Sequence, residues 1–329
     1  MLESDRARHA PGLTRLTRRA WLGLWPMLTA PAWAQTRNMR IIAPFPPGGS
    51  TDTLARALAD KLAPALQQPV VVENRPGANG AIGTEAVARS APDGQTLLVT
   101  TNSGITINPL LYRQMSNPMD SLVPLAQLVE LELVLAVRAD FPAADLAAFI
   151  DLGRRRPGGL TFASVGAGSL SHLAGESFRL ATGTPMVHVP YKGAGPALTD
   201  LLGGQVDAYF GTPPSFVQHV KAGRLRVLAT TAATPSNAFP ALPRVADSVP
   251  GFEVVGWQGL FAPAATPPGL REALERQAIA ALADEAVRAK LEEQGMRVTA
   301  RPASELADII RRERAVWAKV VAEAGIRVE

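Results

Sequence analysis

Cysteine is absent from the 329 residues of this chain, so it offers neither a disulfide nor a lipid-anchoring cysteine. Long apolar runs are also lacking, because the best candidate, Leu131–Val137, is too short to span a bilayer and contains Glu132. The G-x-S-x-G motif of serine hydrolases does not occur, and no lysine follows the glycine-rich turn as a phosphate-binding P-loop requires. These absences favour a soluble protein without a disulfide framework or a nucleotide site.

The first 34 residues have the composition of an export signal. Arg18 and Arg19 precede a short apolar stretch over 20–32, and an A-x-A cleavage pattern ends at Ala34. The paired arginines also fit a twin-arginine motif, so the general and the twin-arginine export routes both stay open. We expect residues 1–34 to be a signal peptide, and the remainder to be soluble in the periplasm after cleavage near Ala34.

The charge of the chain is nearly balanced once the signal is set aside. The whole chain has 33 basic and 29 acidic side chains; residues 1–34 hold five arginines and two acids, which leaves 28 and 27. Binding to nucleic acid needs a concentrated basic face. No nucleic-acid partner is therefore expected.

A glycine-rich corner at 44–52 is the most informative motif present. A β-branched run enters it, and three polar residues at 50–52 then open an apolar-periodic helix. The free backbone N–H groups at such a helix start attract an anion. A second turn of this type lies at 165–169, before a helix expected over 170–180. Two such turns, far apart in sequence, predict a clamp of two α/β halves around a small carboxylate.

Strand and helix patterns alternate in two sets, which predicts parallel sheets with right-handed crossovers. The first set lies within 40–100. The second, from about 141 to 249, is predicted as an insert between two crossing strands, Leu131–Val137 and Gly251–Phe261. Helices expected between 270 and 324 return to the first domain. The predicted organisation is a signal peptide at 1–34, a discontinuous first domain at 35–138 with 255–329, and a second domain at 139–254.

Seven stretches resemble, in order, those of the Bug-type periplasmic solute receptors of tripartite tricarboxylate transporters: Pro44–Asp52, 71–80, 92–94, 108–112, 166–172, 189–193 and 201–207. The resemblance implies a type II periplasmic-binding-protein fold, with two α/β domains, a ligand cleft and two hinge crossings. It implies a small organic acid as ligand (a di- or tricarboxylate, an amino acid or an aromatic acid) and membrane permease subunits as partners. We expect a monomer without a cofactor.

The predicted ligand contacts are mainly neutral donors in loops that follow strands, because ligands of open α/β sheets bind beyond the carboxyl ends of the strands. None of these residues is predicted to be catalytic. The set is Pro47, Gly48, Gly49, Ser50, Thr51, Asp52, Thr101, Ser103, Gly166, Gly168, Ser169, Ser171, His172, Tyr191, Lys192 and Asp207.

Several members of this set have a structural interpretation as well. Gly48 and Gly49 could serve only a positive-φ turn, and Asp52 should cap the helix or orient a water rather than touch an anion. Lys192, the only cation in these loops, either meets a carboxylate or is merely solvated. Asp207 stands at a strand start and suits a structural role equally well.

Competing functions are weaker on this sequence. His172 and Glu176 have a spacing that can hold a metal, but no third ligand is visible, and no metal site is expected. The turn at 166–171 has Ser171 where a dinucleotide fingerprint needs its third glycine. Trp257 and Phe261 are expected in the hinge region or the core. A ligand sensor for a signalling partner cannot be separated from a transport receptor, and a secreted hydrolase is the more distant alternative.

Overall fold

The computed structural model describes residues 38–112 and 115–326, so the predicted signal peptide lies outside the described residues. The first sheet has the strand order β11-β4-β10-β3-β1-β2. Strand β1 pairs in parallel with β2 and β3, whereas β10 runs antiparallel between β3 and β4. Its strands are β1 (Met39–Ala43), β2 (Val70–Asn74), β3 (Thr96–Thr101), β4 (Leu122–Glu132), β10 (Val255–Pro263) and β11 (Met296–Pro302).

The second sheet has the order β7-β6-β8-β5-β9. Strand β6 pairs in parallel with β7 and β8, and β5 runs antiparallel between β8 and β9. Both sheets therefore combine the predicted parallel pairs with antiparallel strands next to the crossings. Its strands are β5 (Val134–Arg138), β6 (Leu160–Ser164), β7 (Met186–Pro190), β8 (Ala208–Gly211) and β9 (Leu225–Thr230).

The longer helices bury an apolar stripe against these sheets. In α1, Leu54, Leu58 and Leu62 recur at helical spacing and are fully buried in the core of the first sheet. The helices that accompany the first sheet are α1 (Ser50–Leu66), α2 (Ala81–Ala88), α3 (Asn108–Leu111), α9 (Pro268–Ala283), α10 (Glu285–Glu293) and α11 (Ala303–Ala324), with short turns η1 (Ala78–Gly80), η2 (Ser103–Ile107) and η3 (Pro118–Asp120).

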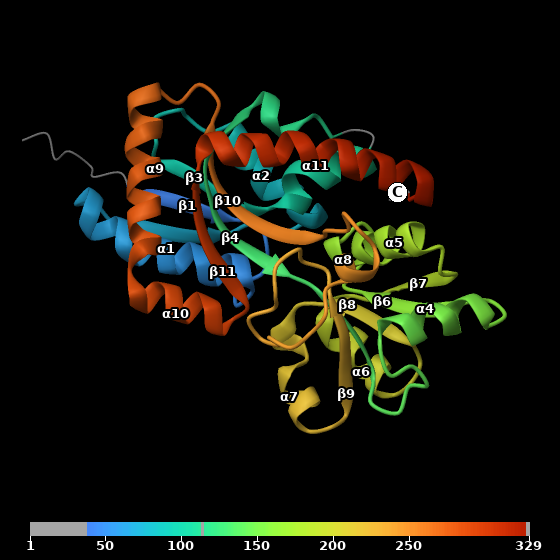
Figure 1. The fold of residues 1–329 in the computed structure, drawn as a ribbon. Coiled ribbons are helices and arrows are strands. Elements are labelled where there is room, and N and C mark those ends of the chain that lie inside the picture. Colours follow the sequence, from blue (N-terminus) through green and yellow to red (C-terminus); the bar gives the residue numbers. More distant parts are fainter. Residues whose placement is uncertain (1–37, 113–114, 327–329) are drawn as a thin grey trace, which may run out of the picture. The chain divides into compact units, whose positions relative to one another are not determined.

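The second sheet has its own core, in which Phe162, Phe178 and Phe210 are fully buried. Helix α11 also packs against α5, so the long C-terminal helix contacts both halves (Figure 1). None of the described helices combines the length and the apolarity needed to cross a membrane. The helices here are α4 (Leu146–Arg155), α5 (Leu170–Thr182), α6 (Ala194–Leu202), α7 (Val217–Lys221) and α8 (Val245–Ser248), with the turn η4 (Pro213–Ser215).

The chain passes between the sheets at two places that are hydrogen-bonded to one another. The apolar run predicted as one strand is divided at Leu133, with β4 in the first sheet and β5 in the second. Thr231, fully buried, donates its backbone N–H to the Leu133 carbonyl (2.9 Å) and accepts from the N–H of Val254 on its own carbonyl (2.9 Å). Its hydroxyl lies 2.6 Å from the Val254 carbonyl oxygen.

The second crossing differs from the prediction in position. Strand β10 begins at Val255 and lies wholly in the first sheet, so the return passage is the segment 231–254 that precedes it. Strand pairing also places β5, residues 134–138, with the second sheet, whereas the predicted boundary lies after residue 138. The division into domains is otherwise a prediction based on the alternating pattern.

Candidate functional site

A pocket of about 230 Å³ opens where loops of the two halves meet. Three larger cavities, two of about 460 Å³ and one of about 690 Å³, have no residue of the glycine-rich turns at 44–52 and 165–169 in their linings. The smaller pocket lies beyond strand ends, where open α/β sheets bind ligands. Its lining is Phe45, Ser50, Asn79, Thr101, Asn102, Ser103, Leu131, Leu133, Val165, Ser169, Leu170, Ser171, Ala194, Tyr209, Gly211, Thr212, Ser215, Gly256, Trp257 and Gln258.

Charged side chains are absent from this lining, as far as the described residues extend. Hydroxyl and amide groups supply its polar side chains, and aromatic and aliphatic groups supply the rest. Such a lining can hold a carboxylate through neutral donors and can cover an apolar portion of the same molecule. Five of the predicted contacts belong to it: Ser50, Thr101, Ser103, Ser169 and Ser171.

The corner before α1 is shaped by Asp52. One carboxylate oxygen of this buried residue accepts the Gly48 N–H at 3.0 Å and the Arg56 Nε at 3.0 Å. The other accepts from Asn74 at 3.0 Å. The Arg56 guanidinium, with the Gly48 and Asn74 hydrogen bonds, lowers the Asp52 pKa to about 2 against the opposing effect of burial. Asp52 thus holds the turn and stays ionised.

The two glycines of this corner have different roles. Gly48 has φ +85°, a conformation that strains other residues, whereas Gly49 is the extended N-cap of α1 with φ −78°. The suggestion that both serve positive φ is therefore wrong for Gly49. Ser50, the first helical residue, lines the pocket, and its hydroxyl accepts from Gln258 Nε2 at 2.8 Å.

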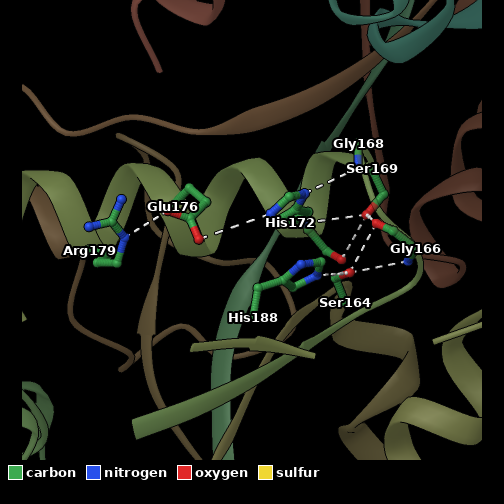
Figure 2. A network of polar contacts seen from close by, with 9 residues as sticks. Ser164, Gly166, Gly168, Ser169, His172, Glu176, Arg179 and His188 are labelled. Atoms are coloured by element: carbon green, nitrogen blue, oxygen red, sulfur yellow. Dashed lines mark hydrogen bonds and ion pairs between the residues drawn. The ribbon is translucent and has the colours of Figure 1, made fainter. Parts of the chain in front are cut away.

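The turn before α5 is also held by side-chain hydrogen bonds to its backbone, here from serine hydroxyls (Figure 2). Ser169 caps the helix, because its hydroxyl accepts the His172 N–H at 3.3 Å and donates to the Gly166 carbonyl at 2.6 Å. The Ser171 hydroxyl accepts the Val165 N–H at 3.0 Å. Gly166 (φ +149°) and Gly168 (φ +73°) shape the turn. Both glycines lie outside the pocket lining, while both serines belong to it.

Behind this turn lies a pair of stacked histidines (Figure 2). His172 Nδ1 accepts the Gly168 N–H at 3.1 Å, and His188 Nε2 lies 2.6 Å from the Ser164 hydroxyl. Burial lowers the pKa of His172 to about 4, and burial together with His172 lowers that of His188 to about 3. Both rings are therefore neutral near pH 7, and His172 supports the turn from behind.

The two residues with metal-like spacing, His172 and Glu176, are both engaged in contacts within the protein. Glu176, four residues after His172, bonds Arg179 Nε at 2.7 Å and lies 4.0 Å from His172 Nε2. Within 38–112 and 115–326 no group of three potential metal ligands is found. Because His172 Nδ1 accepts the Gly168 N–H and Glu176 accepts from Arg179, these side chains support the turn.

Three further predicted residues lie apart from the pocket lining. Lys192 is exposed. The Tyr191 hydroxyl donates to Asp200 at 2.7 Å, and burial, with Asp200, raises the Tyr191 pKa to about 12. Asp207 accepts from Arg156 (2.7 Å) and from the Thr161 N–H (2.8 Å), which is a structural role. The predicted residues that do not line the pocket are Pro47, Gly48, Gly49, Thr51, Asp52, Gly166, Gly168, His172, Tyr191, Lys192 and Asp207.

The structure adds lining residues that the sequence analysis did not select. Asn79 lies in a turn whose residues 77–80 all have positive φ, and its side chain donates to Asn108 Oδ1 at 2.8 Å. Asn108 donates in return to the Asn79 carbonyl at 2.9 Å. Gln258 and Trp257 come from β10. The available signals were an amide in a glycine-rich turn and a glutamine within an apolar strand.

Comparisons with known proteins show the family and the fold of the chain. The model of the tripartite tricarboxylate transporter family receptor matches residues 54–326. Protein BugT of Bordetella pertussis is 38% identical over 311 residues, which are 92% of this chain and 94% of that protein. The solved structure of Rpa4515 from R. palustris with adipate has a TM-score of 0.78 at 32% identity, covering 90% of this chain and 99% of that one. MatC from Rhodopseudomonas palustris with bound malate has a TM-score of 0.73 at 31% identity, covering 86% and 98%.

Proposed function

The chain belongs to the tripartite tricarboxylate transporter receptor family, and on that premise we propose that its 230 Å³ pocket captures a small carboxylated solute for delivery to the membrane subunits of such a transporter. The predicted resemblance and α/β fold class are confirmed. The family is periplasmic, and its members are solute-binding proteins rather than enzymes.

The observation that carries the proposal is the composition of the pocket. Loops of both halves contribute neutral donors to it, and the helices α1 and α5 begin at its edge with Ser50 and Leu170. Helix N-termini favour an anion through their free N–H groups. A neutral site holds a carboxylate without a tight ion pair, which suits reversible capture and release.

The ligands of two relatives support the same class. Rpa4515 was solved with adipate and MatC with malate, and both ligands are small dicarboxylates. We infer that this chain also binds a small organic acid. The acids to be tested are dicarboxylates, monocarboxylates, tricarboxylates, amino acids and aromatic acids.

The test is a thermal-shift screen of the protein from Gln35 onward against these acids, followed by calorimetry on each one that shifts the melting temperature. A ligand at about 100 times its Kd should add about 2.7 kcal/mol to the free energy of unfolding. A screen across the whole set without a shift would contradict the proposal.

Export and assembly complete the proposal. We infer that residues 1–34 are removed, so the protein recovered from the periplasm should begin at Gln35, which intact-mass measurement decides. We also infer a monomer, and light scattering at micromolar concentration would reveal a dimer.

Replacing Arg18 and Arg19 by lysines should block a twin-arginine export route and leave the general export route working.

A further inference from the structure

Glu313 is a carboxyl group placed directly behind the pocket. It belongs to α11, and its Oε2 accepts the Thr106 hydroxyl at 3.0 Å, while Oε1 lies 3.4 Å from Asn102 Nδ2. Glu313 as a residue is half-buried, but the partners of its carboxyl group are fully buried (Thr106) and 2% exposed (Asn102), so the carboxyl group points into the protein. Asn102 is itself part of the pocket lining. One amide side chain therefore separates Glu313 from the pocket.

Two tryptophans face the same carboxyl group. The chain has five tryptophans, three of them within residues 1–34, so Trp257 and Trp317 are the two that remain after Gln35. Both are buried, and neither indole N–H has a hydrogen-bond partner within bonding geometry among the described residues, but both lie near the carboxyl group and lower the Glu313 pKa. Trp257 also lines the pocket. The intrinsic fluorescence of the processed protein therefore reports on the surroundings of Glu313.

Glu313 has no counter-ion among the described residues. The groups that face it are Thr106 and Asn102 from the turn after β3, Trp257 from β10 and Trp317 from its own helix, and none of them is charged. Helix α5, which also packs against α11, supplies no charged partner to it. Burial raises the Glu313 pKa to about 7, although the surrounding hydrogen bonds oppose the rise. The carboxyl group therefore changes its charge near neutral pH.

We propose that Glu313 couples ligand affinity to a proton, because its negative charge behind Asn102 and Trp257 opposes an anion in the pocket. The proposal rests on the proposed function, since it requires a carboxylate ligand. An ionised Glu313 repels that ligand, and the pocket lining has no cation to offset the repulsion. A protonated Glu313 is neutral and does not repel the ligand. By linkage, the bound anion must raise the affinity of Glu313 for its proton by the same factor.

The direction of the effect follows from this linkage. Well below pH 7 Glu313 is protonated and affinity is full; as pH rises through 7 and the ionised form accumulates, affinity falls. If the bound ligand raises the Glu313 pKa by about one unit, affinity should weaken roughly sixfold between pH 6.5 and 8.5. Most small carboxylic acids stay ionised over that range, so the ligand itself contributes little to the change.

The first experiment needs no ligand. Tryptophan fluorescence of the processed protein, titrated from pH 5.5 to 8.5, should show a transition with a midpoint near 7. Glu313→Gln keeps the shape of the side chain without its charge and should abolish the transition. Glu323→Gln, an exposed position on the same helix, is the matched control and should retain it. A flat wild-type titration would overturn the proposal.

The second experiment measures Kd by calorimetry, with adipate as the first probe and the best acid of the screen as the second. The affinity of the wild type and of Glu323→Gln should weaken roughly sixfold from pH 6.5 to 8.5, whereas Glu313→Gln should keep one Kd throughout. A purely structural role would change Kd by a constant factor at every pH and would contradict the proposal.

A measurement without variants covers the case in which Glu313→Gln fails to fold. At pH 7, calorimetry in buffers of different ionisation enthalpy should show that the wild type takes up a fraction of a proton when the acid binds. Zero uptake, or a pH-independent Kd for an acid that does bind, overturns this proposal alone. If no acid binds at any pH, the proposed function fails and this inference fails with it.

Discussion

His172 and His188 stack with their ring centroids 3.6 Å apart and their planes 11° from parallel, behind the turn that opens α5. Two imidazolium ions could not occupy these positions, because like charges at that distance repel strongly in a buried site. His172 Nδ1 accepts the Gly168 N–H and therefore must stay unprotonated. The shape of this pocket loop thus depends on two neutral rings.

Acid should destabilise the protein through this pair. The pKa of His172 is about 4 in the folded state and near 6.5 when unfolded, so the unfolded chain binds more protons below pH 6.5. Stability should therefore be full above pH 6.5 and fall as pH drops toward 4, with a loss of about 2 kcal/mol at pH 5 from His172. Urea unfolding at pH 7.5 and pH 5 measures the change.

The control for this prediction replaces the rings by amides. His172→Asn keeps an acceptor near the Nδ1 position, and His188→Gln keeps a polar group near Nε2, but neither side chain titrates. The double variant should lose less stability than the wild type between pH 7.5 and 5. An equal loss in both proteins would assign the acid sensitivity to other groups.

Gly48→Ala should weaken ligand binding. A Cβ at this position meets nothing within 4 Å, so the cost comes from the φ of +85°, about 1 kcal/mol, and from the altered direction of an N–H that bonds Asp52. Gly49→Ala is the matched control, because φ is −78° and the nearest atom lies at an ordinary 3.6 Å. Calorimetry should show a loss for the first variant and little change for the second; equal affinities would remove this corner from the site.

Ser103→Ala should weaken binding more than Lys192→Gln. Ser103 lines the pocket, whereas Lys192 is exposed and lies outside the lining. A lost hydroxyl contact costs about 1 kcal/mol, which is roughly a fivefold change in Kd, and a solvated lysine should contribute less than twofold. If Lys192→Gln proves the more damaging, the ligand carboxylate reaches the loop after β7, and the pocket described above is incomplete.

Ligand should bring the two halves closer together. Ser50 begins helix α1 of the first half and Ser169 caps helix α5 of the second, and both line one pocket. A ligand that contacts both serines therefore favours the arrangement in which the two halves approach each other. Small-angle scattering should show a smaller radius of gyration with saturating ligand. An unchanged profile would mean a site within one half or a receptor already closed when empty. Gly48→Ala and Gly168→Ala decide between these, because a one-sided site responds to only one of them.

The sequence predicted elements wherever local pattern decides the structure. The buried leucines of α1 recur at helical spacing, and both glycine-rich turns were visible before their helices. The division at Leu133 could not be predicted, because an apolar run is the same whether its strand lies in one sheet or two. Strand β11 was not predicted from the sequence. Arg297 and Arg301, which form ion pairs with Glu130, make the segment after the buried Met296 look polar and hide its alternation of buried and exposed residues.

For the site, the sequence located loops better than individual side chains. Ser50 and Ser169 follow from the helix starts that they occupy. Gln258 lines the pocket because β10 pairs beside β3, with Gln258 opposite Thr101, and Asn79 is held by Asn108, 29 residues away. Such approaches depend on tertiary pairing. The local signals, an amide in a glycine-rich turn and a glutamine within an apolar strand, do not say which residues will meet.

The position of β5 also bears on how the protein folds. The strand that emerges from the crossing at Leu133 is an inner strand, hydrogen-bonded to β8 on one side and β9 on the other. A fragment that starts at Ala139 would lack β5. The edge of β8 and the edge of β9 that pair with β5 would then be unpaired. The second half should therefore form a stable isolated fragment only when Val134–Arg138 are included, and in the whole chain the completion of its sheet should await the strand supplied by the crossing.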